Sequence, residues 1–71
     1  MRRFLIVVEK AGSTFSAYSP DLPGCVATGA TRSEVEENMR QAIELHLEGL
    51  REDGEPVPAG QTIATYVEVA A

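Results

Sequence analysis

The apolar positions form short clusters near both ends of the chain and a helical stripe in its middle. Residues 3–9 and 14–19 are rich in β-branched and aromatic side chains, and residues 10–13 between them form a turn sequence that contains Gly12. These two runs predict a β-hairpin. Residues 25–30 predict a third strand, ended by Gly29, and residues 62–69 predict a fourth.

A single amphipathic helix is predicted to begin at Thr31. Thr31 is a favourable N-cap residue, and Glu34 stands three positions later, as a capping box requires. The apolar residues that follow have the three-to-four spacing of one buried helix face: Val35, Met39, Ala42, Ile43, Leu47 and Leu50. Gly54 can adopt the left-handed C-terminal conformation and Pro56 cannot continue a helix, so the helix is expected to end here.

These elements predict an α+β fold with the order β-β-β-α-β. The helix can carry the chain back across the sheet, so that the fourth strand lies beside the first in a four-stranded mixed sheet of order 3-2-1-4. The first strand is then central and apolar on both faces, and the helix covers only one of them. We therefore expect a homodimer or a permanent complex that covers the other face, with Leu5, Val7 and Tyr66 in the interface. Coverage by loops and tails in a monomer is the alternative.

Size and charge narrow the classes of function. A chain of 71 residues with a net charge of -5 forms one domain that buries only about 60% of its unfolded surface, so self-association would help its stability. Eight of the eleven acidic residues lie in or just after the predicted helix. Such a surface repels phosphate groups, so direct nucleic-acid binding is not expected, whereas a basic protein partner is.

The outward face of the helix carries an acidic stripe that is a candidate partner-binding site. Its members are Glu37, Glu44, Glu48 and Glu52. Two successive like-charged pairs four residues apart are mildly unfavourable in the free protein, and Arg40 and Arg51 offset part of this repulsion. A surface that meets a cationic partner and an ordinary solvated helix face both fit this pattern.

The residues typical of catalytic and metal sites are scarce. Cys25 and His46 are the only thiol and the only imidazole, so no internal disulfide forms and the usual four zinc ligands are lacking. We expect Cys25 to be a small buried residue and His46 to lie in the core or in an interface. No catalytic residue, cofactor or metal is expected. No apolar run approaches the length of a membrane span, and a reducing, cytoplasmic location is the simplest interpretation.

A further motif lies between the second and third predicted strands, where residues 18–25 read Tyr-Ser-Pro-Asp-Leu-Pro-Gly-Cys. Two prolines fix φ and remove backbone donors, so residues 20–24 are expected to form a rigid turn. In its order and spacing, from the apolar residues 4–8 through this turn to Gly-Glu-Pro-Val-Pro at residues 54–58, the chain resembles the HicB-like antitoxin family.

The resemblance implies a truncated ribonuclease H-like fold and a HicA-like partner, which is a small basic mRNA-cleaving toxin that the antitoxin occludes. It also favours a contact role for the turn, with Asp21 and Leu22 on a stiff exposed loop. Nucleases of the ribonuclease H fold hold an acidic residue within the central first strand, where this chain has Phe4–Val8, so enzyme activity is not expected.

The resemblance also bears on domain organisation. Family members that act as repressors carry a further DNA-binding segment, and this chain ends at Ala71. We therefore expect a single HicB-like domain over residues 1–71, without a C-terminal DNA-binding domain. The alternative function is an orphan adaptor or small-ligand-binding module that has kept the fold without a toxin.

Overall fold

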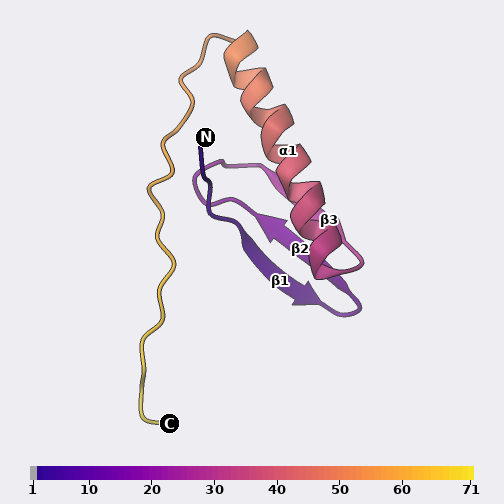
Figure 1. Ribbon diagram of the computed structural model, residues 1–71, viewed down its shortest axis with the longest axis vertical. Coiled ribbons are helices and arrows are strands. Elements are labelled where there is room, and N and C mark those ends of the chain that lie inside the picture. The colour runs from indigo at the N-terminus through magenta and orange to yellow at the C-terminus, as the bar shows by residue number, and fades with distance from the viewer. Residues whose placement is uncertain (1) are drawn as a thin grey trace.

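The computed structural model describes residues 2–71, which form a three-stranded antiparallel sheet, one long helix and an extended C-terminal segment (Figure 1). Strands β1 (Val7–Ala11), β2 (Thr14–Tyr18) and β3 (Val26–Gly29) lie in the order β1-β2-β3. Gly12 begins the two-residue turn between β1 and β2 with a φ of 63°, a conformation that glycine adopts without strain. The predicted hairpin, third strand and α+β class are confirmed.

Strand β1 begins later than expected because its partner ends. Val7 pairs with Tyr18, the last residue of β2, and the chain then turns away at Ser19 and Pro20. Residues 3–6 consequently have no neighbouring strand to complete a ladder. The carbonyl of Leu5 instead accepts a hydrogen bond from the hydroxyl of Ser19 at 3.0 Å.

The fourth strand expected over residues 62–69 is not formed, and the sheet order 3-2-1-4 is therefore wrong for this structure. The segment runs free of the sheet, and every residue from position 59 to 71 is exposed (Figure 1). Its β-branched composition favours a strand, but β-propensity yields a stable strand only where a ladder partner and a packed face are present. Strand β2 is therefore central, and β1 is an edge strand.

Helix α1 (Arg32–Glu52) begins and ends where the sequence predicted. The hydroxyl of Thr31 accepts from the backbone N–H of Glu34 at 3.1 Å, and the Glu34 carboxylate accepts from the N–H of Ala30 at 3.3 Å, one residue before the expected position. At the other end, Gly54 takes a φ of 69°. Its N–H donates to the Arg51 carbonyl and the N–H of Glu55 donates to the Leu50 carbonyl, which completes a Schellman motif.

The core lies between α1 and one face of the sheet. Its buried apolar members are Ala17, Leu22, Cys25, Val35, Met39 and Leu47. The first turn of α1 packs closely on the end of β3, since a Cβ on Gly29 would lie 2.6 Å from the backbone nitrogen of Val35. Helix α1 is the only helix among residues 2–71, and it is not long and apolar enough to cross a bilayer.

Candidate partner-binding surface

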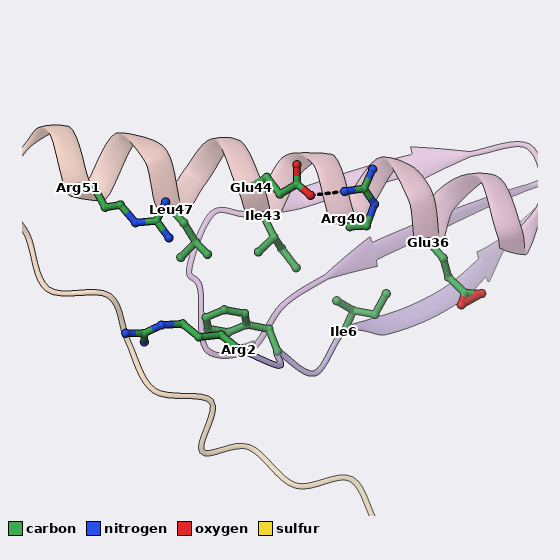
Figure 2. A pocket seen from close by; sticks show the side chains of 9 residues that line it. Arg2, Ile6, Glu36, Arg40, Ile43, Glu44, Leu47 and Arg51 are labelled. Carbon is green, nitrogen blue, oxygen red and sulfur yellow. Dashed lines mark hydrogen bonds and ion pairs between the residues drawn. The ribbon is translucent and has the colours of Figure 1, made fainter.

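The acidic stripe divides into a paired half and an unpaired half. Arg40 donates from Nε to Glu37 at 3.0 Å, and its two terminal nitrogens contact Glu37 and Glu44, as Figure 2 shows for Glu44. Among residues 2–71, the ion pairs involve Glu36, Glu37 and Glu44 but neither Glu48 nor Glu52. The stripe therefore presents most of its uncompensated charge near the C-terminal end of α1.

The electrostatics of Glu37 follow from this pairing. Its hydrogen bonds from Arg40 and Gln41 stabilise the carboxylate and lower its pKa from 4.5 to about 2, and the same pairing raises the pKa of Arg40. A partner that uses Glu37 or Glu44 has to compete with Arg40. Glu48 and Glu52 carry no such cost.

The end of α1 concentrates negative charge where a helix tolerates it least. Glu48, Glu52, Asp53 and Glu55 lie in or just after the last turns, and Arg51 is the basic residue of the last turn. The carbonyl groups at a helix C-terminus carry a partial negative charge of their own, so these carboxylates repel it in the free protein. A cationic side chain docked here would relieve that repulsion.

The turn between β2 and β3 differs from the expected exposed contact loop. Leu22 is fully buried at 0% exposure, so the expectation that it lies exposed is wrong. Its N–H donates to the Ser19 carbonyl, and its own carbonyl accepts from Cys25, both at 3.1 Å, so the turn folds its apolar side chain inward. Asp21 is half-buried and binds Thr62 of the C-terminal segment. The sequence of this two-proline turn gives no indication that the Leu22 side chain points inward.

A groove lies on the helix side of the sheet, between α1 and the residues that precede β1 (Figure 2). Its volume is about 540 Å³. Its apolar lining residues are Phe4, Ile6, Ile43 and Leu47, and its charged ones are Arg2, Glu36, Arg40, Glu44 and Arg51. The groove has no signature in the sequence, because it depends on α1 packing on β2 and β3 more than on β1.

The sheet face opposite the helix carries an apolar row. The register places Val7 opposite Tyr18 and Tyr18 opposite Val26, so the three side chains lie side by side on that face. Tyr18 is 43% exposed and Val26 65% exposed, whereas Leu5 and Val7 are half-buried. Tyr66 is 99% exposed on the C-terminal segment and is not next to Leu5 and Val7 as a fourth strand would have placed it. Tyr18 and Val26 could have been recognised from the strand alternation of the hairpin and third strand.

Cys25 and His46, the two residues considered for catalysis, are buried and half-buried, respectively. Cys25 lies in the core, and burial raises the pKa of its thiol, which disfavours the nucleophilic thiolate. His46 is half-buried on α1. Within residues 2–71, no three His, Cys, Asp or Glu side chains gather in a way that could hold a metal ion.

The comparisons with known proteins identify the family. The model of the HicB-like antitoxins of bacterial toxin-antitoxin systems matches residues 4–70. The chain belongs to this family. A solved structure of a HicA3 and HicB3 toxin-antitoxin complex contains a chain that is similar, with a TM-score of 0.67 and 29% sequence identity over 83% of this chain and 72% of that one.

Curated relatives include proteins of a bacteriophage and of a cyanobacterium. An uncharacterised 14.9 kDa protein of Haemophilus phage HP1 is 39% identical over 87% of this HicB-like chain and 47% of its own length. A UPF0150 protein of Synechocystis is 36% identical over 93% of this chain and 85% of its own length. The chain thus spans about half the length of the phage relative but most of the cyanobacterial one.

Proposed function

We propose that this chain is an antitoxin that binds a small basic HicA-type toxin and blocks its RNA-cleaving site by covering it. The observation that carries the proposal is the HicB-like family match over residues 4–70, together with the similarity to a chain from a HicA3–HicB3 complex. The mechanism requires steric cover and complementary charge and no catalytic group. A regulatory, non-enzymatic role agrees with the family.

The acidic end of α1 is the part of the surface best suited to a basic partner. Glu48 and Glu52 are exposed and free of ion pairs within residues 2–71, and they lie beside the negative end of the helix. Glu37 and Glu44 belong to the same stripe but are held by Arg40. Asp21 is held by Thr62, and Leu22 contributes only by shaping the turn. We therefore assign the first contact with the toxin to Glu48 and Glu52, which would also accelerate capture of a cationic protein at low salt.

The proposal includes the wider setting of the chain. We place it in the cytoplasm as a homodimer in which residues 1–71 form a single HicB-like domain that makes no direct contact with nucleic acid. The truncated ribonuclease H-like fold, the absence of a cofactor and the contact roles of individual residues also stay predictions.

The experiment that tests the proposal starts with the tagged chain as bait in native lysate at low salt, followed by identification and purification of the captured toxin. Its affinity for the chain is then measured as a function of salt, for the original chain and for two double variants. Changing Glu48 and Glu52 to Gln is expected to weaken binding and reduce its salt dependence. The matched variant, with Glu34 and Glu36 changed to Gln at the other end of the helix, is expected to bind like the original. Equal loss in both variants would remove the acidic end from the mechanism.

The groove favours one alternative, a small-ligand-binding module. A volume of about 540 Å³ with an apolar floor and arginines at its rim is within the range of small-molecule pockets. Such a function predicts a ligand that raises the melting temperature of the isolated chain and is displaced by Ile43→Trp, which fills the groove. If the chain captures a toxin and Ile43→Trp does not change that binding, this alternative is excluded.

A further inference from the structure

This chain contains both an unpaired strand edge and a strand-like segment that is not part of a sheet. Among residues 2–71, no strand lies beside the outer edge of β1, so its backbone N–H and C=O groups on that side have no ladder partner there. The C-terminal segment, residues 62–71, has a strand-like sequence and no sheet to join. Its large apolar side chains are strongly exposed: Ile63 85%, Tyr66 99%, Val67 81% and Val69 78%.

The side chains of this segment alternate between two faces, which suit the two sides of the sheet at the β1 edge. Ile63, Thr65, Val67 and Val69 share one face of an extended strand and are all β-branched. Tyr66 and Glu68 lie on the other face. Because a carboxylate in an apolar groove is costly, the face with Glu68 is the one that remains toward water.

The edge of β1 offers both surroundings that such a strand needs. On the helix side of the sheet lies the groove floored by Phe4, Ile6, Ile43 and Leu47, which fits the β-branched face. On the opposite side lies the row of Val7, Tyr18 and Val26, which Tyr66 would extend by one position. A strand added at this edge would therefore bury its β-branched face in the groove and place Tyr66 beside the apolar row on its outer face.

The segment is directed away from the edge of its own copy. A Cβ on Gly60 would lie 2.6 Å from the Arg3 carbonyl oxygen, so the two backbones are in close contact there. Thr62 is then held by Asp21. Beyond this double attachment the segment runs clear of β1, past the end of the sheet (Figure 1). Ten extended residues reach about 30 Å, which is more than the length of a five-residue strand.

We propose that residues 62–71 of each copy add as a strand to the β1 edge of a second copy, in a reciprocal strand-exchanged dimer. A two-fold arrangement satisfies both edges and both segments at once and doubles the buried area, from which a domain of 71 residues would gain stability. Val67 enters the partner's groove, and Tyr66 lies against the partner's Val7 and Tyr18. This self-association does not depend on toxin binding.

The test uses the full purified chain and two neighbouring substitutions. The original chain is expected to be a dimer by light scattering. Val67→Lys places a charge in each groove and is expected to weaken self-association by at least about 100-fold. Glu68→Lys, on the outward face, is the control and is expected to remain dimeric. Neither side chain belongs to the core, so circular dichroism is expected to show the same fold in all three proteins.

A photo-cross-linker identifies the occupant of the edge. Chains with Tyr66 replaced by p-benzoylphenylalanine are mixed as light and heavy isotopic forms, irradiated and digested. Cross-links between light and heavy copies that join position 66 to residues 4–11 are expected, and the same probe at the exposed Leu45 on α1 is expected to give none to this region. A monomeric chain, cross-links confined to single copies, or a Val67→Lys dimer of unchanged affinity would overturn the proposal.

Discussion

Thr62 binds Asp21 through two hydrogen bonds, one from its hydroxyl at 2.8 Å and one from its backbone N–H at 3.3 Å. The two residues are 41 positions apart, and the contact joins the C-terminal segment to the turn between β2 and β3. The Asp21 carboxylate is thus bound by a residue of its own chain.

The hydrogen bonds from Thr62 to Asp21 predict that the start of the C-terminal segment stabilises the folded protein. Thr62→Val removes the hydroxyl with little change in shape and is expected to lower the free energy of unfolding by about 1 kcal/mol, since a hydrogen bond to a carboxylate is lost. Thr28→Val, at an exposed position of β3 away from that segment, is expected to have almost no effect. Urea unfolding of the purified proteins at equal concentration measures both. Equal midpoints for the two variants would contradict the assigned role of the contact.

Two glycines are expected to respond in opposite directions to the same substitution. Gly29→Ala forces a Cβ to within 2.6 Å of the Val35 backbone nitrogen, and the resulting overpacking is expected to cost about 1–3 kcal/mol. Gly49→Ala lies within α1, where nothing outside the helix would be within 4 Å of the new Cβ, and is expected to stabilise the protein by about 1 kcal/mol. Thermal unfolding distinguishes them. A stabilised Gly29→Ala variant would show that β3 and α1 are not packed this closely.

The burial of Leu22 predicts that its substitution affects folding before it affects binding. Leu22→Ala is expected to cost about 2–5 kcal/mol of unfolding free energy, because the residue is fully buried. Leu45→Ala removes the same side chain from a site that is 71% exposed and is expected to change stability by less than about 0.5 kcal/mol. Chemical denaturation gives both values. A Leu22→Ala protein as stable as the Leu45→Ala protein would contradict the burial of Leu22.

The ion pair of Glu37 with Arg40 predicts a pH-dependent contribution to stability. The pKa of Glu37 in the folded state is about 2, below its ordinary value of 4.5, so the unfolded chain binds the proton first as pH falls. The stabilisation is therefore complete above about pH 5 and is lost as pH falls towards 2. The difference in unfolding free energy between the original chain and Glu37→Gln is expected to disappear over this range. Glu48→Gln, without an arginine partner in residues 2–71, is the control, and an identical pH response in both variants would contradict the pairing.

The sequence predicted local structure well where a local rule decided it. The capping residues Thr31 and Glu34, the stop at Gly54 and the spacing of the buried helix face each depend on neighbours within one or two turns. The expected start of β1 and the fourth strand were predicted wrongly, because a ladder needs a partner at long range. Residues 3–6 lose theirs where β2 ends at Tyr18, and residues 62–69 have none in the single chain.

The candidate site was predictable in composition and less so in arrangement. The acidic stripe follows from helical spacing, and the structure keeps Glu37, Glu44, Glu48 and Glu52 on α1. Which of them Arg40 neutralises depends on side-chain conformations that spacing does not determine. The inward orientation of Leu22 and the attachment of Asp21 to Thr62 depend on segments far apart in the sequence.

The most direct test of the antitoxin account is the rate at which the captured HicA-type toxin cleaves RNA in the presence of increasing amounts of the purified chain. We expect cleavage to stop near one chain per toxin molecule at low salt, and we expect the chain with Glu48 and Glu52 changed to Gln to require a clear excess. Undiminished cleavage in a large molar excess of the original, folded chain would contradict the account.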